Sequence, residues 1–188
     1  MKKVGLVVED EYTEAIKEIS KKLSIKPIIR RQRGRISVKK ASAFAEELLR
    51  SCEKVIILGD ADCDERRERE RLQRIYEHLP EGLRRSVHIC IIVHELESWL
   101  LADENAISRV LGKNVKPVEN PESIHDAKEY LEELLLEEAG KKYSTKYLPK
   151  LKREIAKHVN VEKLREKCAS FADFERMVRN GNVRRRDA

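Results

Sequence analysis

The sequence is poor in the residues that mark a disulfide scaffold or a metal ribbon. Its 188 residues include four cysteines, seven glycines and five prolines, and 5% of them are aromatic. Cys52, Cys63, Cys90 and Cys168 show no paired CxxC spacing. Neither a zinc ribbon nor a disulfide framework is therefore indicated, and reduced thiols fit best.

The sequence also lacks a strong excess of one sign of charge. Charged residues make up 39% of the chain with a formal net charge of +6, and 40% of the residues are hydrophobic. This mixture argues against disorder and suffices for a hydrophobic core. The apolar run near the N-terminus, Val4 to Val8, is too short for a signal peptide or a membrane span. We expect a cytoplasmic protein with no membrane partner, whose positive charge permits a polyanionic partner.

The first half of the chain alternates short apolar runs with helical stripes. Strands are expected near Val4–Val8, Pro27–Ile29, Val55–Leu58 and Val87–Val93. Apolar residues recur at helical spacing between these runs. Runs that are apolar on both faces are typical of parallel strands covered by helices. The sequence therefore predicts an α/β fold with a Rossmann-like parallel sheet of about four strands, flanked by helices.

The strand signal disappears after Ala102, and the pattern of the remainder is helical. This change divides the chain into an α/β domain, residues 1–103, and a helical C-terminal extension, residues 104–188, that packs on it. One helix is expected from Glu65 to Leu79. Polar residues that we expect to cap helices are Ser37, Ser123, Asn160 and Ser170.

Acidic residues follow the ends of the expected strands. Glu9 follows the first strand, Asp60 and Asp62 follow the third, and Glu95 and Glu97 follow the fourth. Because the carboxyl ends of parallel strands meet at one edge, we expect Glu9, Asp60 and Asp62 to share a site. Clustered carboxylates repel one another unless they take up protons or a cation. Ligands that are all oxygen favour Mg²⁺ or Mn²⁺, and Glu95 or Glu97 can complete a second metal position.

Other interpretations apply to neighbouring residues. Acids just before a helix also cap it and complement its dipole, which can account individually for Asp10, Glu11, Asp62 or Asp64. Gly59 precedes the acidic loop, where we expect it to let the backbone turn.

Two basic segments are candidate phosphate contacts. They are the segment Arg30–Arg35 and the start of the following helix, with Arg31, Arg33, Arg35, Arg66 and Arg67 as the candidate nucleic-acid-binding residues. A run of charge is equally typical of an ordinary solvated helix face. If the basic residues contact phosphates, nucleic acid is the partner and its binding depends on salt.

Several of these residues resemble the Toprim motif set. Val7-Val8-Glu9 with Glu14, and then Gly59-Asp60-Ala61-Asp62, match a glutamate after the first strand and an Asp-x-Asp after the third. The block from Glu95 to Asp103, Glu-Leu-Glu-Ser-Trp-Leu-Leu-Ala-Asp, is similar to a prokaryotic family of Toprim-like proteins of unknown function. Pro121-Glu122, Asp126-Ala127-Lys128 and Ser170-Phe171 extend this likeness over most of the chain. One departure is Cys63-Asp64, where topoisomerases commonly continue with a glycine.

The resemblance implies a magnesium-dependent phosphoryl-transfer fold, shared by topoisomerases, primases and the overcoming-lysogenization-defect nucleases. It implies that Glu9 is a metal ligand or general acid/base and that Asp60 and Asp62 hold metal, which makes Glu9 and Asp60 the candidate catalytic residues. The chain has no room for the tyrosine-bearing domain of a topoisomerase, so we expect a nuclease acting on DNA or RNA.

Two further functions stay open. One is a non-catalytic, metal-binding protein that binds nucleic acid or acts in an assembly, and the other is a receiver-like phosphoacceptor module. A receiver needs a lysine after a fifth parallel strand, and the sequence shows no such strand. A protein partner and the oligomeric state are also open.

Overall fold

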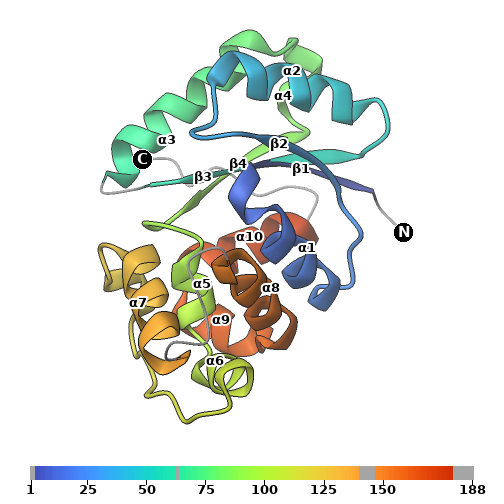
Figure 1. Cartoon of the computed structure of the whole chain (residues 1–188). Helices are drawn as coiled ribbons and strands as arrows, with labels where there is room; N and C mark the ends of the chain where they lie inside the picture. The colour runs from blue at the N-terminus through green and yellow to red at the C-terminus, as the bar shows by residue number, and fades with distance from the viewer. Residues whose placement is uncertain (1–2, 62–63, 140–146, 180–188) are drawn as a thin grey trace.

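The computed structural model describes residues 3–61, 64–139 and 147–179 (Figure 1). Its centre is a parallel sheet of four strands in the order β2-β1-β3-β4. The strands are β1 (Val4–Glu9), β2 (Ile28–Gln32), β3 (Lys54–Asp60) and β4 (Val87–Ile92). The predicted α/β fold class, with a parallel sheet, flanking helices and a helical C-terminal part, is therefore confirmed.

Alternation along the strands sends side chains into two separate cores. On one face, Val7, Val55 and Ile57 pack with the layer formed by α2 (Val38–Leu49), α3 (Glu65–Gln73) and the 3-10 helix η2 (Arg74–His78). The short helix α4 (Glu81–Arg84) leads into β4. This layer lies above the sheet in Figure 1. Both faces of the sheet are covered, which explains why the interior of β1 and of β3 is apolar on both faces.

The opposite face packs on the 3-10 helix η1 (Asp10–Tyr12), on α1 (Thr13–Lys22) and on the helical C-terminal part (Figure 1). That part consists of α5 (Glu97–Leu101), α6 (Glu104–Leu111), η3 (Pro121–Ser123), α7 (Ala127–Ala139), α8 (Leu148–His158), α9 (Val161–Lys167) and α10 (Ala169–Arg179). One hydrophobic cluster runs from Leu6 and Ile56 of the sheet to Trp99 and Phe171. The predicted boundary after Asp103 thus separates two segments that share a core.

The block from Glu95 to Asp103 joins the helices to one another. Trp99 is fully buried, with its ring 5.2 Å from that of Phe171 between centroids, and its Nε1 donates to Ser170 Oγ at 2.8 Å. Asp103 accepts from the backbone N–H of Asn105 at 3.1 Å and of Asn160 at 2.8 Å. The carboxylate therefore holds the starts of α6 and α9 together.

Two of the four expected caps are confirmed and two are wrong. Ser37 caps α2 and Asn160 caps α9. Ser123 lies in η3, and its hydroxyl donates to the Asn120 carbonyl. Ser170 lies inside α10, where Glu122 accepts the N–H groups of residues 169 and 170. At the start of α10 a carboxylate from a distant segment thus supplies the acceptor, and charged acceptors make the stronger bonds.

Two other local expectations need correction. The helix expected over 65–79 is divided into α3 and η2, and the basic segment is partly strand, since Arg30 to Gln32 belong to β2. Among the described residues, no helix is long and apolar enough to cross a membrane.

Gly59 does not make the expected turn, because it lies within β3. Its role is close packing: a Cβ built there clashes with Leu72 Cδ1 of α3, and Leu72 is fully buried. Gly59→Ala should therefore destabilise the fold by about 1–3 kcal/mol, as overpacking does. Gly82→Ala is the matched control, since nothing lies within 4 Å of its added Cβ.

Urea unfolding measures both variants. Adding Leu72→Ala to Gly59→Ala should make the glycine substitution less costly than it is alone, because the clashing methyl group is gone. Equal costs for Gly59→Ala and Gly82→Ala would contradict this account.

Candidate functional site

Asp60 is the centre of the carboxyl edge of the sheet. It is the last residue of β3 and has the same strand parity as Ile56 and Leu58, so it faces the helical part. Its exposed fraction is 8%, and the Tyr12 hydroxyl donates a hydrogen bond to its carboxylate. Burial raises the pKa of Asp60 well above its ordinary value, and the charges of nearby glutamates raise it further. Asp60 therefore keeps its proton to a higher pH than an exposed aspartate does.

Tyr12 donates the hydrogen bond to Asp60, although its spacing in the sequence predicts only an apolar position of a helix. It is buried, and its burial together with the charge of Asp60 raises the pKa of its phenol far above the ordinary value. The hydroxyl thus remains protonated and stays a donor. A tyrosine directly after a run of acids was the only signal of this role, since tyrosine combines an apolar body with a polar tip.

Glu9 ends the neighbouring strand β1 at the same edge. The register pairs Val7 with Ile57, so Glu9 lies beside the end of β3, and its charge contributes to the raised pKa of Asp60. Its side chain is half-buried. Glu9 has the strand parity of Val7, whereas Asp60 has that of Leu58, so the structure shows an electrostatic influence between the two residues and their shared site stays a prediction.

Glu95 and Glu97 reach this edge from the segment after β4. Both add to the negative charge around Asp60. Glu95 accepts from the backbone N–H of Lys128 at 2.7 Å. Glu97 is 1% exposed and accepts from Lys152 Nζ at 2.6 Å through Oε1, whereas its Oε2 is buried and has no hydrogen-bond partner among the described residues.

Four of the five predicted metal ligands thus influence one another electrostatically, and Asp62 lies outside the described residues. The donors are all carboxylate oxygens, which suit Mg²⁺ or Mn²⁺ in kind. Within residues 3–61, 64–139 and 147–179, however, no three His, Cys, Asp or Glu side chains are grouped so that they can hold one ion. Two of the glutamates have partners within the protein: Glu95 accepts from the backbone N–H of Lys128, and Glu97 accepts from Lys152 Nζ. The metal site remains a prediction.

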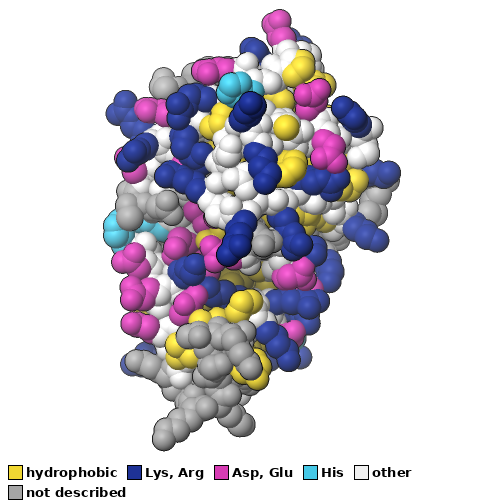
Figure 2. Space-filling view, turned by 45° about the horizontal axis from the view of Figure 1, so that its top comes forward, with side chains coloured by type: hydrophobic (Ala, Val, Ile, Leu, Met, Phe, Trp, Pro, Cys, Tyr) yellow, Lys and Arg dark blue, Asp and Glu magenta, His cyan; other side chains and the backbone are white. Residues whose placement is uncertain are grey.

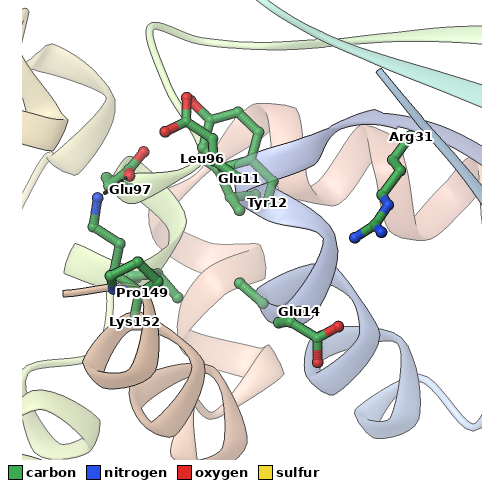
Figure 3. Close-up of a pocket in the computed structure, with 10 residues that line it drawn as sticks. Glu11, Tyr12, Glu14, Arg31, Leu96, Glu97, Pro149 and Lys152 are labelled. Carbon is green, nitrogen blue, oxygen red and sulfur yellow. Dashed lines mark hydrogen bonds and ion pairs between the residues drawn. The ribbon is translucent and has the colours of Figure 1, made fainter. Parts of the chain in front are cut away.

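A pocket of about 250 Å³ opens beside the acidic edge, between α1, α5 and α8. Its walls combine acids with two cations and apolar residues, and they are formed by Glu11, Tyr12, Glu14, Ala15, Arg31, Leu96, Glu97, Leu100, Pro149 and Lys152. In Figure 3, Arg31 lies across the pocket from Glu97 and Lys152. The pocket is large enough for a small group, and both signs of charge face it.

The basic residues expected to bind nucleic acid have different surroundings. Arg31, in β2, and Arg33 are exposed, and Arg67 is exposed on α3. Lys and Arg side chains are spread over the face seen in Figure 2, with acidic side chains among them. No separate, purely basic stripe of described side chains is visible on that face.

Arg35 and Arg66 are engaged in ion pairs. Arg35 pairs with Glu68 at 2.5 Å, and the Glu68 side chain is 1% exposed. Arg71 also pairs with Glu68, and these two arginines hold the pKa of Glu68 below its ordinary value despite the burial. Arg66 pairs with Glu70 at 3.0 Å on the exposed surface. Arg35 therefore has a structural role that the sequence pattern did not reveal.

The raised pKa of Asp60 makes the stability of the metal-free fold depend on pH. The unfolded chain loses this proton near the ordinary value and the folded chain at a higher pH, so stability falls as pH rises between the two. Asp60→Asn removes the effect. In chelator, the variant should melt above wild type at pH 8, with the difference shrinking toward zero near pH 4.

A tenfold difference in acid dissociation constant between the folded and unfolded chains corresponds to about 1.4 kcal/mol of stability. Each kcal/mol changes the melting temperature by about 2–4 °C in a domain of this size. Scanning calorimetry from pH 4 to 8 measures the difference. The exposed Asp126, replaced by Asn, is the control. A melting difference that does not change with pH would contradict the assignment.

Residues 9–179 match the family described as Domain of unknown function (DUF4276). No curated protein and no solved structure matches the chain. Since the match spans nearly the whole chain, including every described residue of the acidic edge, this protein belongs to the DUF4276 family.

Proposed function

We propose that the protein is a Mg²⁺- or Mn²⁺-dependent nuclease, or another phosphoryl-transfer enzyme that acts on nucleic acid. The observation that carries the proposal is the position of Asp60, buried at the carboxyl end of β3 within the field of Glu9, Glu95 and Glu97. In open α/β sheets this edge is where ligands bind. Acidic side chains that lie close together at this edge repel one another, and binding a cation is the most direct way to relieve that repulsion.

Glu9, Asp60 and Asp62 would hold the ion. A bound divalent ion supplies charge neutralisation at a phosphodiester oxygen and a lowered pKa for its water. Tyr12 orients the Asp60 carboxyl group through the hydrogen bond that it donates. Glu9 is half-buried and so remains within reach of solvent, which suits it to accept a proton from water.

The Toprim likeness supports the same assignment by analogy. A glutamate ends β1 and an aspartate ends the adjacent strand β3, which is the arrangement that the resemblance implies for Glu9 and Asp60. Fold analogy alone does not establish a reaction. Its value here is that it selects nucleic acid as the substrate among phosphate compounds.

A non-catalytic protein that binds nucleic acid is the second candidate. The observation in its favour is that the acidic edge already contains internal cations: Lys128 pairs with Glu11 at 2.8 Å, and Lys152 pairs with Glu97. A receiver-like module has less support, since the described sheet has four strands. We place the protein in the cytoplasm, where the buried free thiols Cys52, Cys90 and Cys168 would remain reduced.

Binding of nucleic acid should depend on the exposed arginines near the acidic edge. Replacing Arg31, Arg33 and Arg67 together by Ala should weaken binding and lower the slope of log K against log salt. Each lost phosphate contact removes about 0.7–0.9 from the slope. Fluorescence anisotropy with labelled single- and double-stranded oligonucleotides measures both quantities.

The matched control removes the same charge from the opposite end of the sheet. Lys21, Lys22 and Lys26 are exposed there, near the end of α1 and before β2. Their replacement by Ala should leave the slope close to that of wild type. Equal effects of the two triple variants would assign the binding to net charge alone.

Cleavage tests the catalytic part of the proposal. Purified protein should nick or degrade DNA or RNA with Mn²⁺ or Mg²⁺ and stop when chelator is added. Glu9→Gln and Asp60→Asn should each reduce the rate by orders of magnitude with the fold intact, because the ion stabilises charge that develops in the transition state. The gel assay should include Asp126→Asn, which we expect to retain activity.

Two results would count against a nuclease. Cleavage that survives both Glu9→Gln and Asp60→Asn would indicate a contaminant or a different site. A wild type that is inactive on single- and double-stranded DNA and RNA, yet binds them, would favour the non-catalytic candidate.

A further inference from the structure

Lys152 occupies a position between two carboxylates beside the acidic edge. Its Nζ lies 2.6 Å from Glu97 Oε1 and 2.6 Å from Glu132 Oε1. The three side chains come from α8, α5 and α7, and Figure 3 shows Glu97 and Lys152 reaching toward one another across the pocket wall. Two carboxylate oxygens around one positive centre are the beginning of a coordination shell for a cation.

The ammonium group of Lys152 lies in a largely buried environment. The exposed fractions of the side chains are 15% for Lys152, 2% for Glu97 and 29% for Glu132. Removing charges from water is costly, so a buried glutamate requires a permanent countercharge. The pair is therefore more than a surface salt bridge, and Lys152 is what makes an ionised Glu97 tolerable in the absence of a metal.

One oxygen of this group has no partner within the part of the chain that the structure describes. Glu97 Oε2 is buried and accepts no hydrogen bond, although an unpaired buried acceptor is unfavourable. The oxygen belongs to a side chain that also adds to the negative field at Asp60. A divalent cation carries more charge than an ammonium group and would interact favourably with both oxygens of Glu97.

The field of the same acids extends to a second lysine. Lys128 of α7 pairs with Glu11, and the charges of Glu97 and Glu132 also help to raise its pKa. Both lysines belong to the helical C-terminal part, and they pair with Glu11 near the sheet edge and with Glu97 of α5.

We propose that Glu97 and Glu132 form a divalent-cation site at which the Lys152 ammonium group is the resident cation of the metal-free protein. Mg²⁺ or Mn²⁺ binds there by displacing Lys152, so this lysine lowers the affinity of the protein for metal. The inference rests on the proposed function, because it adds a second cation position next to Glu9 and Asp60.

The experiment measures Mn²⁺ binding to the full chain at pH 7.5 by electron paramagnetic resonance of the free ion. Lys152→Met keeps the length of the side chain and removes its charge, and should raise the affinity of the tightest site about tenfold or more. Lys150→Met is the matched control on the exposed side of the same helix and should behave as wild type. Lys152→Arg retains the cation and should show no gain. A Lys152→Met variant that binds Mn²⁺ no more tightly than Lys150→Met overturns the inference.

Thermal melting gives a second readout. In chelator Lys152→Met should melt below wild type, because Glu97 loses its countercharge, and saturating Mn²⁺ should raise its melting temperature by more than it raises that of wild type. If the variant needs Mn²⁺ in order to fold, that dependence supports the inference in the same way. Glu132→Gln alters a more exposed ligand and should weaken Mn²⁺ binding. Unchanged binding by Glu132→Gln overturns the inference.

The outcomes separate this inference from the proposed function. If Asp60→Asn abolishes Mn²⁺ binding while Lys152→Met and Glu132→Gln both bind like wild type, the site at Glu9 and Asp60 stands and the one at Glu97 and Glu132 does not. If wild type binds no Mn²⁺ but Lys152→Met does, the inference is supported independently of cleavage. If neither binds Mn²⁺, both ideas fail.

Discussion

A carboxyl group buried among other acids is the constraint on which the rest of the site depends. Asp60 closes β3 in a position where burial and the charges of Glu9, Glu95 and Glu97 all oppose its ionisation. Each neighbouring contact reduces that conflict. Tyr12 donates to Asp60, Lys152 neutralises Glu97, and a backbone N–H satisfies Glu95. Hydrogen bonds and lysines thus compensate part of the charge of these acids, and we propose that a divalent cation takes over this role when it binds.

The helical C-terminal part serves two purposes at once. It covers one face of the sheet through the core that contains Trp99 and Phe171, and it delivers Lys128 and Lys152 to the acidic edge. The segment from Glu95 to Asp103 connects the two purposes, since its apolar residues are buried while its acids fix helix starts or enter the site. A motif of this kind is constrained by folding as well as by chemistry.

Much of the fold was predictable because its signals are local. Apolar runs such as Val55–Leu58 and helical stripes such as that of α2 follow from periodicity, and the position of acids at strand ends then follows from the parallel topology. The caps at Ser37 and Asn160 are local as well. These features need only the residues that contain them.

The missed features depend on contacts between distant segments. The partnership of Lys152 with Glu97 spans 55 positions, and Glu122 reaches α10 over 48. Neither leaves a mark in the local sequence. A glycine before an acidic loop predicts a turn at Gly59, whereas the close approach of Leu72 exists only when α3 is packed on β3. Arg35 is likewise predicted from its basic segment as a phosphate contact, whereas its ion pair with the buried Glu68 depends on the packing of a distant helix.

The central claim is that the acids at the carboxyl edge of the sheet bind a divalent cation. Anomalous diffraction from a crystal soaked in Mn²⁺ tests it most directly, since the ion is located without knowledge of the substrate. The account predicts an anomalous peak at the ends of β1 and β3, coordinated by Glu9 and Asp60. Crystals that diffract well and show no peak at this edge at millimolar Mn²⁺ would contradict it.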